Sequence, residues 1–124
     1  MRKSARDAAQ PVGALARRWE ELHDTAAQLA TLAQIAPEPA NAEISAFPGL
    51  LGNASDWQRE LAWQGMADID AMMRPGLAAL RTLTERGQDA SAPALALWRE
   101  FHAARSAVLF AVQPQTQAES LEAL

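Results

Sequence analysis

The chain has 124 residues, of which 49% are hydrophobic and 21% charged, with a formal net charge of −4. Its length suits one domain with one core, and its acidic balance argues against nucleic acid or an anionic membrane as a partner, because a long-range positive field is lacking. The sequence contains no cysteine, which excludes disulfides, thiolate zinc sites, iron–sulfur clusters and a cysteine nucleophile.

The chain has no segment that approaches the roughly 20 apolar residues needed to span a bilayer. Its basic start, "MRKSAR", is followed by "DAAQPVGALARRW", which lacks the unbroken apolar stretch of a signal peptide. We therefore expect a cytoplasmic protein without a transmembrane segment.

An apolar heptad seam predicts the first helix, from about Ala9 to Ala36. The seam residues alternate at spacings of three and four: Val12, Leu15, Trp19, Leu22, Ala26, Leu29, Ala33 and Ala36. The segment "APEPAN" follows, and its prolines end the helix, since a residue before proline is displaced from the α region.

The next stretch, "ISAFPGLLGNASDWQRELAWQG", opens as an apolar, kinked loop. Surface loops are usually polar, yet this one carries Phe47, Leu50 and Leu51 around Pro48. Two interpretations stay open: the apolar group caps the open end of a bundle, or it is a docking knob for a partner.

A second helix begins after Ser55, a favourable N-cap, and ends at Gly87, a favourable C-cap. Pro75 lies inside the pattern, so either one helix kinks near Met72 or two helices meet at "RPG"; the apolar phase continues across the proline, which favours the kink. The predicted buried stripe is Trp57, Leu61, Gly65, Ile69, Met72, Gly76, Leu80 and Leu83, widened by Ala62, Met66, Met73 and Leu77.

A last helix is predicted from about Ala92 to Val112, with Ser91 as its N-cap. Pro114 stops it. The sequence therefore predicts an all-α domain over residues 1–112, a helical hairpin or three-to-four-helix bundle with a proline-kinked second helix, followed by a flexible C-terminal tail over residues 113–124.

Catalytic and metal sites find little support. Glu20 and His23 form a Glu-x-x-His motif, but di-iron bundles need that motif twice with two further carboxylates. No residue is placed by sequence to complete a triad with His102, and Asp68 and Asp70 point to different sides of a helix. We expect no enzyme activity, no metal and no cofactor.

Arg105 lies inside the apolar arc of the last helix, between Phe101 and Val108. Buried arginine is uncommon unless it is paired. We expect either a carboxylate partner from another helix, such as Asp68 or Asp70, or a side chain that extends its charged end to solvent.

Exposed aromatic residues are the best indication of a function. Trp63 and Phe110 lie off the predicted apolar stripes, so a single core would leave both exposed. Together with the apolar loop and the last helix they suggest a surface for a protein, a hydrophobic polymer or a second copy of the chain. The predicted partner-binding residues are Phe47, Leu50, Leu51, Trp63, Trp98 and Phe110.

Two stretches, "FPGLLGNASDWQRE" and "GQDASAPALALWREFHAARSAV", carry a family resemblance. They resemble the proline-glycine element and the leucine and tryptophan helix of the accessory subunit of two-component polyhydroxyalkanoate synthases, and of granule-coating phasins. The resemblance rests on Pro48, Leu51, Gly52, Trp57, Glu60, Leu95, Leu97, Trp98 and Phe101. It implies a non-catalytic helical protein that binds the synthase catalytic subunit or the polyester granule surface.

An alternative interpretation is a small-ligand-binding bundle or regulatory sensor. Its pocket would be lined by Trp57, Met66, Met72, Met73 and Trp98. Stabilisation by apolar ligands would favour this alternative.

Overall fold

The computed structural model describes residues 11–114, and within that range it contains four helices and no strand. The helices are α2 (Val12–Ala33), α3 (Ala42–Asn53), α4 (Asp56–Glu85) and α5 (Ser91–Ala111). The all-α class is thus confirmed. The predicted start of the first helix at Ala9 and most of the predicted tail lie outside the described residues.

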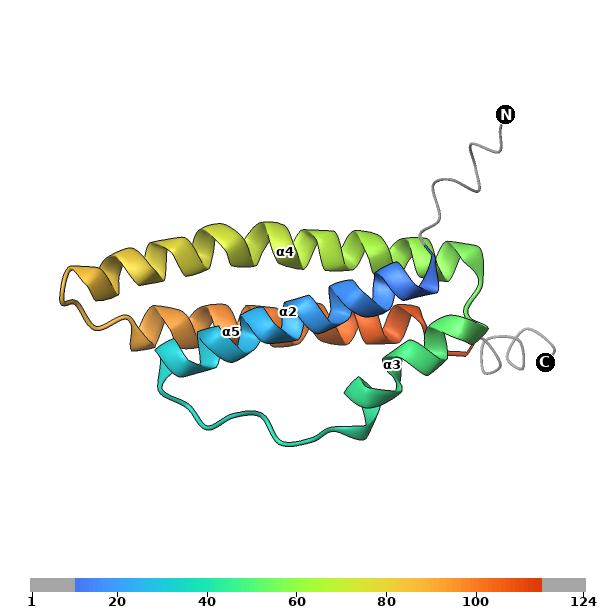
Figure 1. Ribbon diagram of the computed structural model, residues 1–124, viewed down its shortest axis with the longest axis horizontal. Coiled ribbons are helices and arrows are strands. Elements are labelled where there is room, and N and C mark those ends of the chain that lie inside the picture. The colour runs from blue at the N-terminus through green and yellow to red at the C-terminus, as the bar shows by residue number, and fades with distance from the viewer. Residues whose placement is uncertain (1–10, 115–124) are drawn as a thin grey trace, which may run out of the picture.

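The three long helices pack against one another in pairs, and the short α3 packs on α2 and α5. Figure 1 shows that α2 and α4 run in the same direction, while α5 runs opposite to both. We call residues 34–41 the strap. After α2, the strap and then α3 return the chain to the other end of the bundle, where α4 begins.

The stretch that we expected to be an apolar loop is helix α3, so that prediction is wrong. Asn41 caps it, its side chain accepting from the N–H groups of Glu43 and Ile44. Pro48 has no N–H, which leaves the carbonyl of Ile44 without its helical partner. The indole N–H of Trp19 donates to this carbonyl at 3.2 Å, so the helix-breaking proline is accommodated by a hydrogen bond from α2.

The core confirms the predicted seam of the first helix from Leu15 to Ala33, whereas Val12 and Ala36, which were also predicted to be buried, are exposed. On α4 the buried face is shifted from the predicted stripe. On α2 the buried side chains include Leu15, Trp19, Leu22, Ala26, Leu29 and Ala33. On α4 they are Gln58, Ala62, Met66, Ile69, Met73, Leu77 and Leu80. Because α4 contacts both α2 and α5, its buried face is centred between the two neighbours, and Trp57 and Leu61 are left outside it.

The helix ends agree in part with the predictions. Ser55 caps α4 in a reciprocal capping box with Gln58. The N-cap of α5 is Ala90 instead of Ser91, and the Asp89 carboxylate accepts from the Ser91 N–H at 2.9 Å. Helix α4 is continuous through Pro75; a kink there stays a prediction.

Two helices end on a left-handed residue. Gly87 has φ of 76° after α4, and Gln34 has φ of 60° after α2. In both places the hydrogen bonds form a Schellman motif, Gln88 to Leu83 and Ile35 to Ala30. Glycine adopts this conformation without a Cβ penalty, whereas glutamine does not.

We expect Gln34→Gly to raise the free energy of unfolding by about 0.5–1 kcal/mol, since relief of the left-handed penalty exceeds the added chain entropy. Gly87→Ala should lower it by about 1 kcal/mol for the converse reason. Urea unfolding followed by circular dichroism measures both changes, and equal effects of the same sign would contradict this explanation.

Candidate functional site

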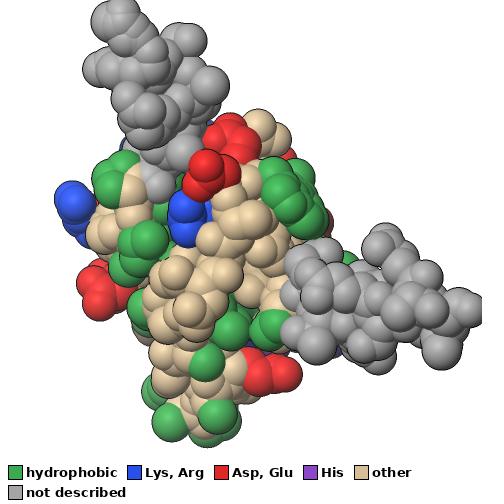
Figure 2. Space-filling view, turned by 90° about the vertical axis from the view of Figure 1, so that its right-hand side faces the viewer, with side chains coloured by type: hydrophobic (Ala, Val, Ile, Leu, Met, Phe, Trp, Pro, Cys, Tyr) green, Lys and Arg blue, Asp and Glu red, His purple; other side chains and the backbone are tan. Residues whose placement is uncertain are grey.

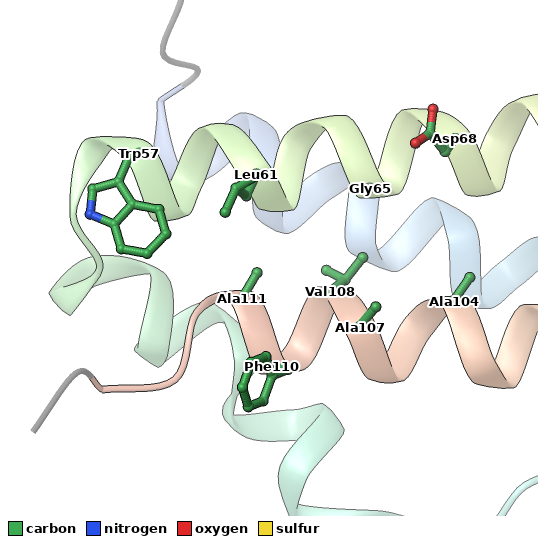
Figure 3. A pocket seen from close by; sticks show the side chains of 9 residues that line it. All are labelled: Trp57, Leu61, Gly65, Asp68, Ala104, Ala107, Val108, Phe110 and Ala111. Carbon is green, nitrogen blue, oxygen red and sulfur yellow. The ribbon is translucent and has the colours of Figure 1, made fainter. Parts of the chain in front are cut away.

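An open, largely apolar groove lies between the first half of α4 and the second half of α5 (Figure 3). Its volume is about 450 Å³. The lining residues are Trp57, Leu61, Gly65 and Asp68 from α4, and Ala104, Ala107, Val108, Phe110 and Ala111 from α5. We call this the α4/α5 groove.

The α4/α5 groove collects most of the exposed hydrophobic mass of the described residues. Among residues 11–114 four large hydrophobic side chains are exposed, and three of them line the groove: Trp57 (54%), Leu61 (48%) and Phe110 (79%). Figure 2 looks at this end of the bundle and shows hydrophobic side chains at the surface beside acidic and basic ones. Isolated exposed hydrophobics are ordinary, but a contiguous group marks an interaction surface.

The geometry gives the groove large residues at one end and small ones in its floor. In Figure 3, Trp57 and Leu61 extend from α4 toward α5, while alanine side chains extend from α5 toward α4. Phe110 projects at the edge, and the exposed Asp68 carboxylate points away from α5 on the rim. The groove therefore offers an apolar trough with a negative charge beside it.

Two glycines bring α4 and α5 close together. A Cβ placed on Gly65 would lie 2.8 Å from Cγ2 of Val108, and one on Gly76 would lie 2.5 Å from Cδ2 of Leu97. Both contacts are shorter than carbon atoms tolerate. Gly65 lies in the groove and sets the depth of its floor, whereas Gly76 brings the two helices together outside it.

The predicted partner-binding residues are scattered by the structure. Phe47 and Leu51 are fully buried, and Phe47 stacks on Trp19 with ring centroids 3.9 Å apart. Leu50 is half-buried against the core. The apolar group of α3 thus packs inward, and the docking-knob interpretation is wrong for Phe47 and Leu51.

Of the three predicted partner-binding aromatic residues on α4 and α5, one is exposed and two are half-buried. Trp63 is half-buried, with the Arg18 guanidinium 4.8 Å from its ring centroid, so its predicted exposure is wrong. Trp98 is half-buried against Phe101 and His102. The exposure of Phe110 is confirmed; its role in binding stays a prediction.

The sequence interpretation missed Trp57 and Leu61 because it placed them on the buried stripe. One signal was available. Both share a helical face with Gly65, and a glycine marks a place where a neighbouring helix approaches closely. On this face of α4 the neighbouring helix α5 therefore packs closely at Gly65. Trp57 and Leu61, nearer the start of the helix, stay exposed.

A second cavity of about 450 Å³ lies beneath the strap. We call it the strap pocket. Its apolar wall includes Ala26, Ala30, Ile35, Ile44 and Trp98, and its polar lining includes His23, Thr31, Glu38, Asn41 and Ser45.

Arg105 is 4% exposed and has a carboxylate partner, as expected, but the partner is Glu38 of the strap. Its two terminal nitrogens donate to the two oxygens of Glu38 at 2.8 and 2.7 Å. Asp70, one of the expected partners, pairs with Arg74 instead. The Phe101 ring lies 5.2 Å from the guanidinium.

Two histidines complete the surroundings of Arg105. His23 Nδ1 donates to the Trp19 carbonyl at 2.8 Å, because a carbonyl only accepts. His23 Nε2 is therefore free to accept from Arg105 at 3.3 Å. Nε2 of His102 lies 3.1 Å from Arg105 and 3.4 Å from Glu38.

The pKa values of His23 and Glu38 shift downward. Burial lowers the pKa of His23 below its ordinary value of 6.5, and the nearby Arg105 charge acts in the same direction. Hydrogen bonds from Arg105 lower the pKa of Glu38 below its ordinary 4.5. The folded state therefore favours neutral His23 beside ionised Glu38.

Within residues 11–114, no group of three acidic or histidine side chains is arranged to hold a metal ion. Glu20 is exposed while His23 faces the core, so the Glu-x-x-His pair does not converge on one point. None of the described helices is long and apolar enough to cross a membrane.

Comparison of the chain with protein families, with curated proteins and with solved structures finds no match. The two cavities and their lining residues therefore carry the functional assignment.

We expect Gly65→Ala to lower the free energy of unfolding by about 1–2 kcal/mol, because the stiff Val108 side chain cannot move aside easily and overpacking outweighs the gain in helix propensity. The same change in a Val108→Ala background should be neutral or stabilising, since the clashing methyl is gone. Chemical unfolding of the four proteins measures the coupling; additive effects would contradict the contact.

Stability should fall in two steps as the pH is lowered. Below about pH 6.5 the unfolded chain protonates His23 before the folded chain does, and below about pH 4.5 the same holds for Glu38. His23→Gln should remove the first step, and Glu38→Gln should reduce the second, to which the lowered pKa of Asp89 also contributes through its hydrogen bonds from Ser91. Urea unfolding between pH 3 and pH 8 tests this, and a His23→Gln profile parallel to the parent would contradict it.

Proposed function

We propose that this protein is a non-catalytic interaction protein whose α4/α5 groove receives an amphipathic helix of a partner protein. The observation that carries the proposal is the convergence of Trp57, Leu61 and Phe110 on one groove. Aromatic residues at the centre of such surfaces commonly supply most of the binding free energy.

The shape of the groove favours a helix as occupant. Its α4 wall presents Trp57, Leu61, Gly65 and Asp68 at successive helical turns, which matches apolar residues spaced three and four apart on a bound helix. The alanine floor of α5 leaves room for large side chains. The occupant would carry a lysine or arginine near Asp68, since the chain itself has a net charge of −4.

The resemblance to accessory subunits of polyhydroxyalkanoate synthases offers a particular partner, the synthase catalytic subunit. It also offers an alternative occupant, the polyester granule surface, while a homodimer would bury the same residues against a second copy. All three fit a protein acting in the cytoplasm, and they give different experimental outcomes.

The alternative function, a small-ligand-binding bundle, expected one pocket lined by tryptophan and methionine. Those residues do not line a common cavity. Met66 and Met73 are fully buried in the core, and Trp57 and Trp98 line different cavities. Of the predicted pocket residues, Trp98 retains a place beside a cavity that could hold a ligand.

The partner is identified by placing a photo-cross-linking phenylalanine analogue at position 110 in the native host and identifying the adduct by mass spectrometry. The purified synthase catalytic subunit and polyhydroxybutyrate particles are then tested directly for binding. Sedimentation equilibrium of the isolated chain tests the homodimer.

We expect Trp57→Ser or Phe110→Ser to weaken binding of the cross-linked partner by at least about 30-fold, as truncation of an aromatic hot-spot residue does. Asp68→Lys should also weaken binding, by charge reversal. Val12→Ser is the matched control, because Val12 is exposed but lies outside the groove. Isothermal titration measures affinity, and circular dichroism checks that helicity is kept.

Equal losses for Val12→Ser and Phe110→Ser would contradict the assignment of the groove. Binding only to polymer particles would replace the helix by the granule surface. Concentration-dependent dimerisation abolished by Phe110→Ser would replace it by a second copy.

A further inference from the structure

The middle of the strap is attached to the helices through one polar side chain, that of Glu38. Backbone hydrogen bonds hold its two ends, from the Ile35 N–H to the Ala30 carbonyl and from the Ser45 N–H to the Asn41 carbonyl. Pro37 and Pro39 have no N–H to donate. Between residues 36 and 40 the strap makes no backbone hydrogen bond to the rest of the described chain. Its tie is the pair of hydrogen bonds from Arg105 to Glu38.

The groups that hold Glu38 belong to the long helices and form a carboxylate receptor. Arg105 and His102 lie on α5 and His23 lies on α2. Arg105 is fixed by the two histidines and by the Phe101 ring. A planar guanidinium with two parallel donors matches a carboxylate in geometry and charge. The receptor is thus built on two long helices, whereas its present occupant sits on a segment with few other attachments.

The strap pocket opens directly beside this receptor. Glu38 and His23 belong both to the wall of the pocket and to the cluster around Arg105. The remaining wall is largely apolar, with Trp98, Ile35 and Ile44 facing the same space. A molecule that placed a carboxylate at the position of Glu38 would lay its apolar part against these residues.

We infer that the strap pocket binds a monocarboxylate with an apolar tail, and that Glu38 is the internal carboxylate which the ligand displaces from Arg105. The apolar surface buried by the tail offsets the exchange of one carboxylate for another. Displacement frees the strap. This site is separate from the α4/α5 groove and does not depend on the function proposed for it.

Octanoate and 4-phenylbutyrate are suitable probes, with their primary amides as matched neutral controls. Titration calorimetry measures affinity, and NMR of the histidine rings and tryptophan indoles locates the site. The carboxylates should bind and shift His23 and Trp98, while Trp57 in the α4/α5 groove stays unshifted. The amides should bind at least about tenfold more weakly, since they lose a charged hydrogen-bonding partner.

Glu38→Gln should tighten carboxylate binding about tenfold, because a neutral amide competes less well for Arg105. Glu43→Gln is its control: it removes the same charge from the exposed start of α3 and should leave affinity unchanged. A Glu38→Gln, Arg105→Gln double variant, which avoids a lone buried charge, should lose carboxylate binding.

Equal affinity for amides and carboxylates would overturn the inference, as would equal effects of Glu38→Gln and Glu43→Gln. Failure of both probes to bind folded Glu38→Gln protein would also overturn it. Should the double variant not fold, the comparison of Glu38→Gln with Glu43→Gln still decides.

Discussion

Because α2 and α4 run in the same direction, the chain must travel back along the bundle before α4 begins (Figure 1). The strap and α3 make this return, and they lie on the side of the bundle formed by α2 and α5. The short apolar helix α3 covers this side of the core with Phe47 and Leu51. The Trp19–Phe47 stack, worth about 1 kcal/mol beyond burial, and the Trp19 hydrogen bond to Ile44 hold it there.

The return of the chain also decides which surface stays open. Since α3 packs on α2 and α5, the junction of α4 with α5 has no such cover from the described chain. Along this junction Gly65 and Gly76 let the helices approach closely. Before Gly65, the first turns of α4 carry Trp57 and Leu61 outside the buried face. The α4/α5 groove is therefore a consequence of topology and of close glycine packing together.

The strap supplies the half-buried Glu38 carboxylate that pairs with the buried Arg105 guanidinium. Removing one member of a buried pair costs far more than the pair contributes, because a charge is left without a partner. Arg105 therefore needs a carboxylate, and the fold supplies it from a segment with few other attachments. The same arrangement ties the conformation of residues 34–41 to whatever carboxylate occupies the receptor.

The sequence by itself determined the features that depend on neighbours along the chain. The seam of α2, the capping box at Ser55 and the helix end at Gly87 follow from helical periodicity and from the φ preferences of single residues, which act locally. Tertiary structure decided the rest. Pro48 sits in a helix because Trp19, 29 positions earlier, satisfies the carbonyl it frees; Trp63 is covered by Arg18 while Trp57 is not; and Arg105 pairs with Glu38, 67 positions away. Each depends on which helix packs beside which face, and periodicity fixes only that a face is apolar, not which neighbour covers it.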